Sequence, residues 1–251
     1  MTGRRIPLAL AIACAFALSS CKSGPAPKEE SRPLEAAERK AIVDSMTQHL
    51  KARYGVWLSP RVQGAVSRLL ARVDQGLAVV LLNSDKPICA AGLAGNIYVS
   101  KGALRQIVYE NELAFLLARE AALARSGALE ERLSQAADKG QDLQRLGLLE
   151  KDGLYALPHH VHVDADRAAV KTLYSLGYDP RGAVSLLQRW NPLPPSEDRL
   201  SAVREEIAKL SPMRDPVING PLIDELRAAL SSKGSGDARR PTVNPGVGRK
   251  K

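Results

Sequence analysis

The stretch Glu112-Leu-Ala-Phe-Leu-Leu-Ala-Arg-Glu-Ala-Ala-Leu-Ala-Arg125 decides how this 251-residue chain is interpreted. It belongs to a segment, Gly102 to Ser126, that we predict to be one helix. Glu120 lies one turn after Leu116-Leu117 and one turn before Ala124, and therefore shares the apolar face of that helix. A carboxylate on an apolar face requires a partner or a raised pKa, so this glutamate needs a structural or chemical explanation.

Helical patterns also flank this segment on both sides. Apolar residues recur with helical spacing from Leu34 to about Tyr54, and Ser59-Pro60 predicts the start of a helix that ends near Val73. After the central helix, Gly177 fits a helix stop and Asp179-Pro180 fits a cap followed by a new helix. The later helices that we predict are Leu129–Leu149, Val163–Leu176, Pro180–Trp190 and Ser196–Leu210.

Two short apolar runs predict strands. Leu77–Leu82 is closed by Asn83-Ser84-Asp85 and reads as a buried strand, and Ile97–Val99 follows the flexible stretch Ala91–Gly95. The order is helices, a small sheet, then more helices, without the alternation of strand and helix that a doubly wound sheet requires. The sequence therefore predicts a mainly α (α+β) fold, and with 45% hydrophobic residues one well-buried domain is feasible.

These landmarks together resemble the gluzincin zinc-metallopeptidase family, which includes the CAAX prenyl protease and periplasmic peptidases of outer-membrane quality control. The resemblance covers about residues 56–210. Its landmarks, in order, are Gly95–Leu104, Glu112–Ala118, Ala165-Asp166-Arg167, Gly177–Pro180 and Pro194–Leu200. It implies a zincin-like domain with a small sheet, in which Gly95–Leu104 supplies an edge strand beside the active-site helix.

The departures from the family lie at the metal site. Where the family carries His-Glu-x-x-His, this chain has Arg119-Glu120-Ala121-Ala122-Leu123, so Glu120 remains as a vestigial general base between two positions that cannot bind zinc. The third ligand position is His162, which could still coordinate, and a later histidine-proline appears as Leu193-Pro194. One imidazole does not hold zinc usefully, so we expect no metal and no other cofactor.

Arg119 suggests what replaces the metal. We hypothesise that its guanidinium supplies the missing positive charge and pairs with Glu120 or Asp166. Asp166 is the better partner, because adjacent helical residues do not face each other. The alternative places Arg119 and Glu120 exposed on a shallow groove.

A rival reading places a relocated zinc site in the cluster His159-His160-Val161-His162. If a helix begins after Pro158, His162 and Asp166 share a face at i, i+4, which suits a transition metal. That reading makes the chain an active metalloendopeptidase with atypical ligands. The simpler alternative is a set of partly exposed histidines at a helix start.

The N-terminus predicts export and anchoring. Residues 1–20 combine Arg4 and Arg5 with a short apolar run and read as a signal peptide. Leu18-Ser-Ser-Cys21 resembles a bacterial lipobox, which implies lipidation of Cys21, and residues 21–33 then form a polar tether. The alternative is a plain signal with Cys21 free. Lys22 favours the outer membrane, facing the periplasm, over the inner membrane.

Charge and cysteine content add two further expectations. Of the net charge of +9, Arg4 and Arg5 leave with the signal, and residues 232–251 carry six basic side chains against Asp237, so the remainder holds only about +2. The tail is expected to be disordered, and with 4% aromatic residues and no recognition module we expect no nucleic-acid binding. Cys89 is predicted to be a small buried side chain, with no disulfide partner in the mature chain.

These observations predict a lipid-anchored protein of the bacterial envelope with a metallopeptidase-like domain over residues 34–231. Its expected role is that of a pseudopeptidase that binds extended or unfolded envelope polypeptides, by β-augmentation at the edge strand, as an assembly or quality-control factor. Two alternatives remain open: the active metalloendopeptidase described above, and a structural lipoprotein that acts through its basic tail.

Overall fold

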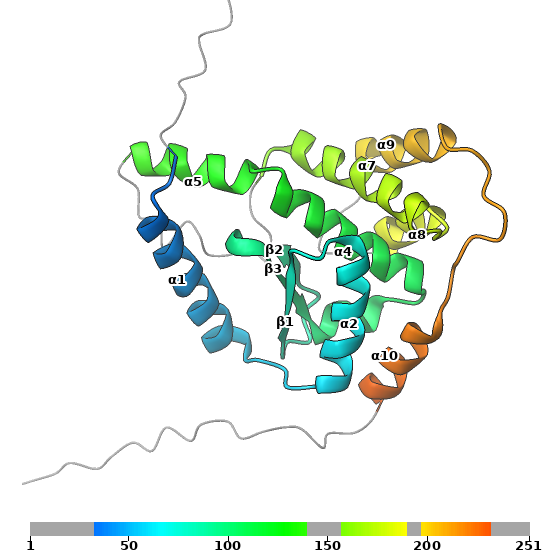
Figure 1. Cartoon of the computed structure of the whole chain (residues 1–251), viewed down its shortest axis with the longest axis horizontal. Helices are drawn as coiled ribbons and strands as arrows, with labels where there is room; N and C mark the ends of the chain where they lie inside the picture. Colours follow the sequence, from blue (N-terminus) through cyan, green and yellow to red (C-terminus); the bar gives the residue numbers. More distant parts are fainter. Residues whose placement is uncertain (1–32, 140–156, 190–196, 232–251) are drawn as a thin grey trace, which may run out of the picture. The chain divides into compact units, whose positions relative to one another are not determined.

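The computed structural model describes residues 33–139, 157–189 and 197–231 (Figure 1). This part of the chain is mainly helical with one small sheet, which confirms the predicted mainly α (α+β) class. Its helices are α1 (Ala36–Tyr54), α2 (Pro60–Val73), η1 (Leu93–Gly95, a 3₁₀ turn), α3 (Lys101–Gln106), α4 (Glu110–Arg125), α5 (Ala128–Asp138), α7 (His159–Ser175), α8 (Arg181–Arg189), α9 (Glu197–Ala208) and α10 (Pro221–Ser231).

The sheet has three strands in the order β1-β3-β2. The central strand β3 (Asn96–Ser100) runs parallel to β1 (Ala78–Leu82) and antiparallel to β2 (Cys89–Ala91). The expectation that Gly95–Leu104 supplies the edge strand is therefore wrong: its strand is paired on both sides, and β2 is the edge strand that contacts α4. We did not predict β2, because three small residues carry little strand pattern.

The outer edge of β1 is also covered. The Trp57 amide donates to the Leu81 carbonyl at 3.0 Å, Val56 forms a bridge with Leu82, and the Gln63 side chain donates to the Val79 carbonyl at 2.8 Å. The segment between α1 and α2 thus pairs briefly with the outer edge of β1. Helix α2 itself packs against β1.

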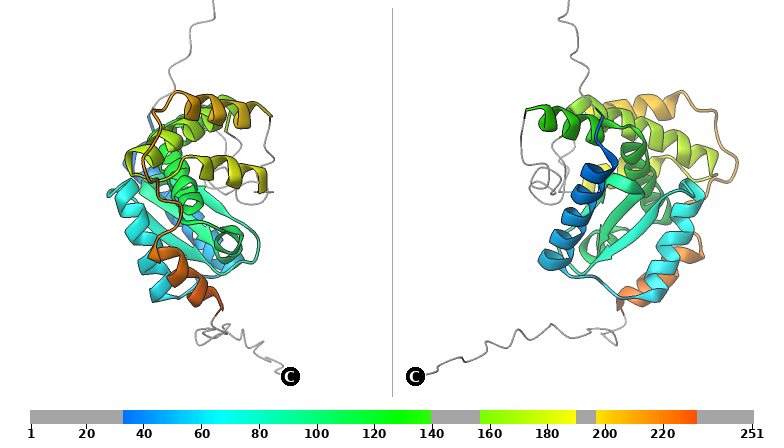
Figure 2. Two further views of the ribbon diagram at one scale, coloured as in Figure 1. Left: turned by 90° about the vertical axis from the view of Figure 1, so that its right-hand side faces the viewer. Right: turned by 60° about the vertical axis from the view of Figure 1, so that its left-hand side comes forward.

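Helix α4 lies at the centre of the domain, between the sheet on one side and α7 and α8 on the other (Figures 1 and 2). All twelve residues from Glu110 to Ala121 are buried, as expected for a helix that is enclosed on every side. Their apolar members join the main core with α2, α7, α8, α9 and α10. Polar residues in so buried a helix need partners within the protein.

The predicted single helix Gly102–Ser126 is interrupted between α3 and α4. The Glu112 carboxylate, which is fully buried, accepts hydrogen bonds through Oε2 from the amides of Val108 (2.9 Å) and Tyr109 (3.2 Å). These bonds satisfy the amides of the two residues that precede α4 and fit the extended conformation of Tyr109, from which the chain enters the helix. The break follows from this cap, which the helical pattern of the sequence did not reveal.

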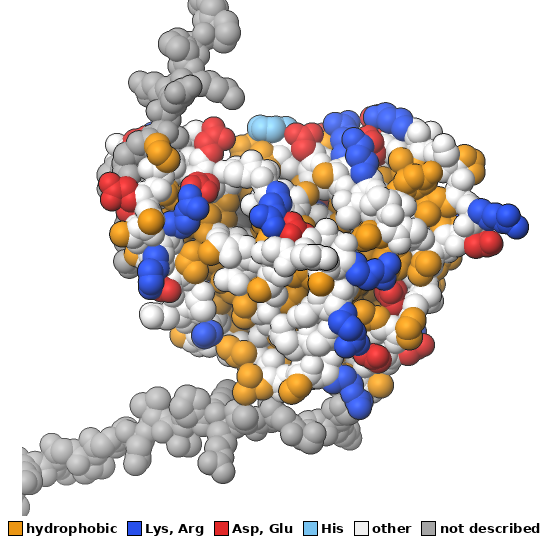
Figure 3. All heavy atoms as spheres, in the orientation of Figure 1, with side chains coloured by type: hydrophobic (Ala, Val, Ile, Leu, Met, Phe, Trp, Pro, Cys, Tyr) orange, Lys and Arg blue, Asp and Glu red, His pale blue; other side chains and the backbone are white. Residues whose placement is uncertain are grey.

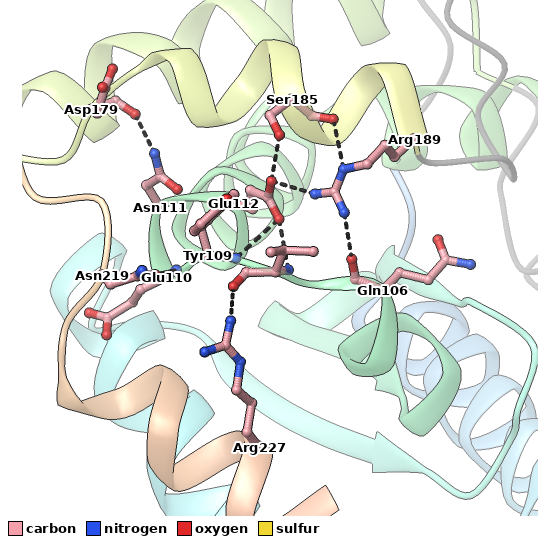
Figure 4. Close-up of polar contacts among 11 residues, drawn as sticks. Gln106, Tyr109, Glu110, Asn111, Glu112, Asp179, Ser185, Arg189, Asn219 and Arg227 are labelled. Atoms are coloured by element: carbon pink, nitrogen blue, oxygen red, sulfur yellow. Dashed lines mark hydrogen bonds and ion pairs between the residues drawn. The ribbon is translucent and has the colours of Figure 1, made fainter.

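The same region anchors the start of α4 to its neighbours (Figure 4). Glu112 Oε1 accepts from the Ser185 hydroxyl of α8 at 2.6 Å and pairs with Arg189. The Asn111 side chain donates to the Asp179 carbonyl at 3.0 Å, and Asn219 accepts from the Glu110 amide at 3.3 Å. Because α4 is fixed at this end, the position of its later turns is well defined.

Most other predicted boundaries hold within a few residues. The start and end predicted for α2 are confirmed, and Gly177 ends α7 with a φ of 81° that favours glycine. Asp179 Oδ1 accepts from the Arg181 amide at 2.9 Å, as a cap should. Helix α7 begins at His159, four residues earlier than predicted, and α10 was not predicted. The predicted end of the helix after Leu129, up to Leu149, lies outside the described residues.

Candidate functional site

Arg119 of α4 is buried at the centre of a polar cluster, with 1% of its side chain exposed. Its Nε donates to Asp166 Oδ1 at 3.0 Å, its Nη1 pairs with Glu120 Oε1, and its Nη2 donates to His162 Nδ1 at 2.8 Å. The guanidinium therefore contacts three polar side chains that the sequence singled out.

Asp166 brings a second arginine to the same place. Its carboxylate, fully buried on α7, accepts from Arg199 Nε at 2.6 Å and from Arg199 Nη2 at 2.9 Å. Arg199 lies on α9, so one carboxylate connects three helices. We call Arg119, Glu120, Asp166, Arg199 and His162 the arginine–carboxylate cluster.

Glu120 links the cluster to the sheet. Its Oε2 accepts from the Ala91 amide of β2 at 2.8 Å, while Oε1 pairs with Arg119. Burial raises the pKa of Glu120, and the neighbouring Arg119 and the Ala91 amide oppose that rise. The predicted alternative of an exposed Arg119 and Glu120 on a shallow groove is wrong, because both are 1% exposed.

Arg119 has two carboxylate partners, not the single one that the sequence favours. Arg119 reaches both carboxylates, although Glu120 is its neighbour in the helix. Side chains of adjacent helical residues start in different directions, but a side chain as long as that of arginine can bend back to reach its neighbour. The structure thus brings together Arg119, Glu120, Asp166 and His162, all of which the sequence had singled out.

The cluster is balanced in charge. Two guanidinium groups face two carboxylates, which is the arrangement that a buried ionic group requires. His162 adds no charge at neutral pH: burial, together with the positive charges of Arg119 and Arg199, lowers its pKa to about 4. Because His162 Nδ1 accepts from Arg119, the ring proton sits on Nε2.

The donor set does not fit a zinc ion. Arg119 and Leu123 offer no ligand atom, and Leu123 instead packs with Ala91 and Ala165 in a small apolar cluster. Within the described residues, no three His, Cys, Asp or Glu side chains are grouped as metal ligands. The oxygen atoms of Glu120 and Asp166 and the Nδ1 atom of His162 accept hydrogen bonds from guanidinium groups or a backbone amide. This arrangement leaves no set of donor atoms for a metal ion among them.

The structure separates the histidines of the predicted alternative site. His159 and His160 are exposed at the start of α7, and His159 Nε2 lies 3.7 Å from an Asp198 carboxylate oxygen. His162, which lies about one turn further along α7, contacts Arg119 of α4 instead. His162 and Asp166 do share a face of α7, as the spacing predicted, but both side chains bind Arg119 and not a metal ion.

A pocket of about 170 Å³ opens beside Glu120. Its walls come from β2 and the turn that follows it, from the last turns of α4, and from the start of α5. The residues that line it are Arg39, Ala90, Ala91, Gly92, Leu93, Ala94, Gly95, Glu120, Leu123, Ala124, Gly127, Leu129, Glu130, Leu157 and His162.

Sequence reasoning missed two groups of the site. Arg199 was noted only as part of a helix entry, although it falls with Leu200, Ala202, Val203 and Glu206 on the buried side of α9. A basic residue on a buried face was the available signal. The backbone amide of Ala91 carries no signal in the sequence. Cys89 is buried as predicted, and burial raises the pKa of its thiol.

Several predicted features lie outside the described residues. They are the signal peptide, Cys21 with its tether up to residue 32, Leu193-Pro194 and the basic tail 232–251. In the described part, none of the helices has the length and apolar composition needed to cross a bilayer. On the face shown in Figure 3, basic and acidic side chains of the described residues are interspersed.

Comparison with models of known protein families gives no match, and no curated protein matches the chain.

Proposed function

We propose that this chain is a pseudopeptidase of the gluzincin type that binds extended or unfolded polypeptides in the bacterial envelope. In this proposal it has no catalytic metal and is held at the membrane by a lipid on Cys21. The supporting observations are the small sheet beside a central buried helix and the arginine–carboxylate cluster on that helix.

The position of the Arg119 guanidinium is the main observation that supports a protein without peptidase activity. It binds Glu120, Asp166 and His162, and an arginine remains charged at any physiological pH. Glu120 pairs through Oε1 with Arg119 and accepts through Oε2 from the Ala91 amide, so the carboxylate that would act as the general base is held as the partner of a fixed cation. Because Arg119 and Leu123 offer no donor atom at two of the three ligand positions, a zinc hydroxide mechanism lacks its ligand set here.

Metal analysis with a protease assay tests this part of the proposal. We expect the purified full chain to contain no stoichiometric zinc and to leave casein or an unfolded outer-membrane protein uncut, with or without added zinc. Glu120→Gln should make no difference to either result. Stoichiometric zinc together with proteolysis that Glu120→Gln abolishes would overturn the proposal in favour of the metalloendopeptidase alternative.

The contact between Glu120 and Ala91 changes how a polypeptide would bind. Strand addition to β2 needs its outward amides, and the amide of Ala91 is already taken. The adjoining pocket remains available, with the turn Gly92–Gly95 on one side and Ala124 on the other. We therefore place polypeptide binding at the pocket and not along the full edge of β2.

A filled-pocket variant tests the binding site. Fluorescently labelled, unfolded casein should bind the full chain, and Ala124→Phe should weaken that binding at least fivefold by occupying the pocket. Ala52→Phe adds the same ring to an exposed position of α1 and serves as the matched control. Equal binding by the two variants would show that the pocket is not the site.

A further inference from the structure

The pocket beside Glu120 has the size of a single ring. Its volume of about 170 Å³ lies below the roughly 300–1,000 Å³ of sites for drug-sized ligands. Apolar cavities of about 150 Å³ accept one benzene molecule. Most of the lining is apolar or glycine, with Leu93, Leu123, Leu129 and Leu157 as its largest apolar members. The space therefore suits one aromatic side chain better than a cofactor.

The charged residues at the pocket are paired with other residues. Arg39 and Glu130 form an ion pair with each other, and Glu120 is held by Arg119 and the Ala91 amide. His162 presents a neutral ring whose proton is on Nε2. A charged ligand group would find no free opposite charge among these residues, whereas an uncharged group with one hydrogen-bond acceptor is well matched.

We propose that this pocket binds one aromatic side chain, of the size of phenylalanine, from the bound polypeptide, and that His162 Nε2 donates to a backbone carbonyl of the same segment. The inference rests on the proposed function, because it assumes that a polypeptide binds here. A Cβ at Gly127 would meet no atom within 4 Å, so the backbone of that segment has room to approach the pocket there.

Four capped pentapeptides test the side-chain preference. Their sequence is acetyl-Gly-Ser-X-Ser-Gly-amide, with Phe, Ala, Lys or Glu as X, and their dissociation constants are measured by calorimetry on the full chain. Burial of the ring should make the Phe peptide bind at least tenfold more tightly than the Ala peptide. The Lys and Glu peptides should bind no better than the Ala peptide.

Two variants assign the preference to the pocket. Ala124→Phe should reduce the ratio between the Phe and Ala peptides to less than twofold, and Leu157→Ala should enlarge the pocket so that a Trp peptide overtakes the Phe peptide. Ala52→Phe should leave the ratio unchanged. If Ala124→Phe does not fold, Leu157→Ala decides alone.

The results separate this inference from the function on which it rests. Equal affinities for the four peptides, with casein still bound, would overturn the aromatic preference alone. A ratio between the Phe and Ala peptides that Ala124→Phe leaves unchanged, or a Trp peptide that does not overtake the Phe peptide in Leu157→Ala, would also overturn it, because the ring would then bind elsewhere. If neither casein nor any peptide binds, the proposed function fails as well.

Discussion

Arg119 carries a permanent positive charge inside the protein, and polar side chains surround its guanidinium group. The side chain is 1% exposed and has partners on α4 and α7. Replacing one member of such a group leaves the others buried and unpaired, which is more damaging than the loss of one contact.

We therefore expect Arg119→Met to lower the free energy of unfolding by about 3–5 kcal/mol, because Glu120 and Asp166 lose their shared cation. Urea denaturation at pH 7 measures this. Arg61→Met, at an exposed position of α2, should change stability by no more than about 0.5 kcal/mol. A double-mutant cycle with Asp166→Asn should give a coupling energy of about 0.5–3 kcal/mol, and no coupling would contradict the charge-replacement hypothesis.

His162 predicts a pH dependence with a definite sign. Its pKa is about 4 in the folded protein and about 6.5 in the unfolded chain, so the unfolded chain binds more protons between these values. The contribution of His162 to stability is complete above about pH 6.5 and declines as the pH falls towards 4.

His162→Gln should remove this contribution, so the stability of the variant should fall less steeply than that of the parent between pH 6.5 and 4. Urea midpoints at several pH values measure the slope. His160→Gln, at an exposed position on the same helix, should keep the parental slope. Identical slopes for His162→Gln and the parent would show that this histidine is not held neutral.

At the scale of elements, close packing makes two glycines respond oppositely to alanine. A Cβ at Gly102 would lie 2.1 Å from the Asp85 carbonyl oxygen, which belongs to the backbone, whereas a Cβ at Gly64 would meet only Arg68 Nη1 at 3.6 Å. Gly102 is the second residue of α3, which follows the central strand directly, and Gly64 lies within α2.

We expect Gly102→Ala to destabilise the protein by roughly 1–3 kcal/mol, because the backbone must move away from the new methyl group. Gly64→Ala should stabilise it by about 0.5–1 kcal/mol, because alanine loses less conformational entropy in a helix. Thermal unfolding of the two variants gives the comparison. A stabilised Gly102→Ala variant would be inconsistent with the close approach of Asp85.

The elements differ in how far the sequence could predict them. Ser59-Pro60 and Gly177 act locally, so α2 and the end of α7 were predictable. The strand β2 and the break before α4 depend on β3, Glu112 and α8, which are brought close only by folding. For the same reason the sequence could suggest Arg119 and Asp166 as a pair but could not reveal the Ala91 amide.

At the scale of the whole molecule, the proposed lipid on Cys21 determines where the chain is found after fractionation. Cys21→Ser should move the protein from the membrane fraction to the soluble periplasmic fraction, because the mature chain would lose its acyl chains. Immunoblots of the fractions measure the shift. Ser20→Ala, at the neighbouring small residue, should leave the protein in the membrane fraction. Membrane association that survives Cys21→Ser would point to another anchor.

The way the sheet ends on both sides has a consequence for the protein at high concentration. Val56, Trp57 and Gln63 occupy the outer edge of β1, and Glu120 occupies the outward amide of Ala91 in β2. Unpaired strand edges are where copies of a protein join into aggregates. Strand β2 is buried against α4, and Glu120 also takes the outward amide of Ala91, which could otherwise pair with a strand of a neighbouring molecule.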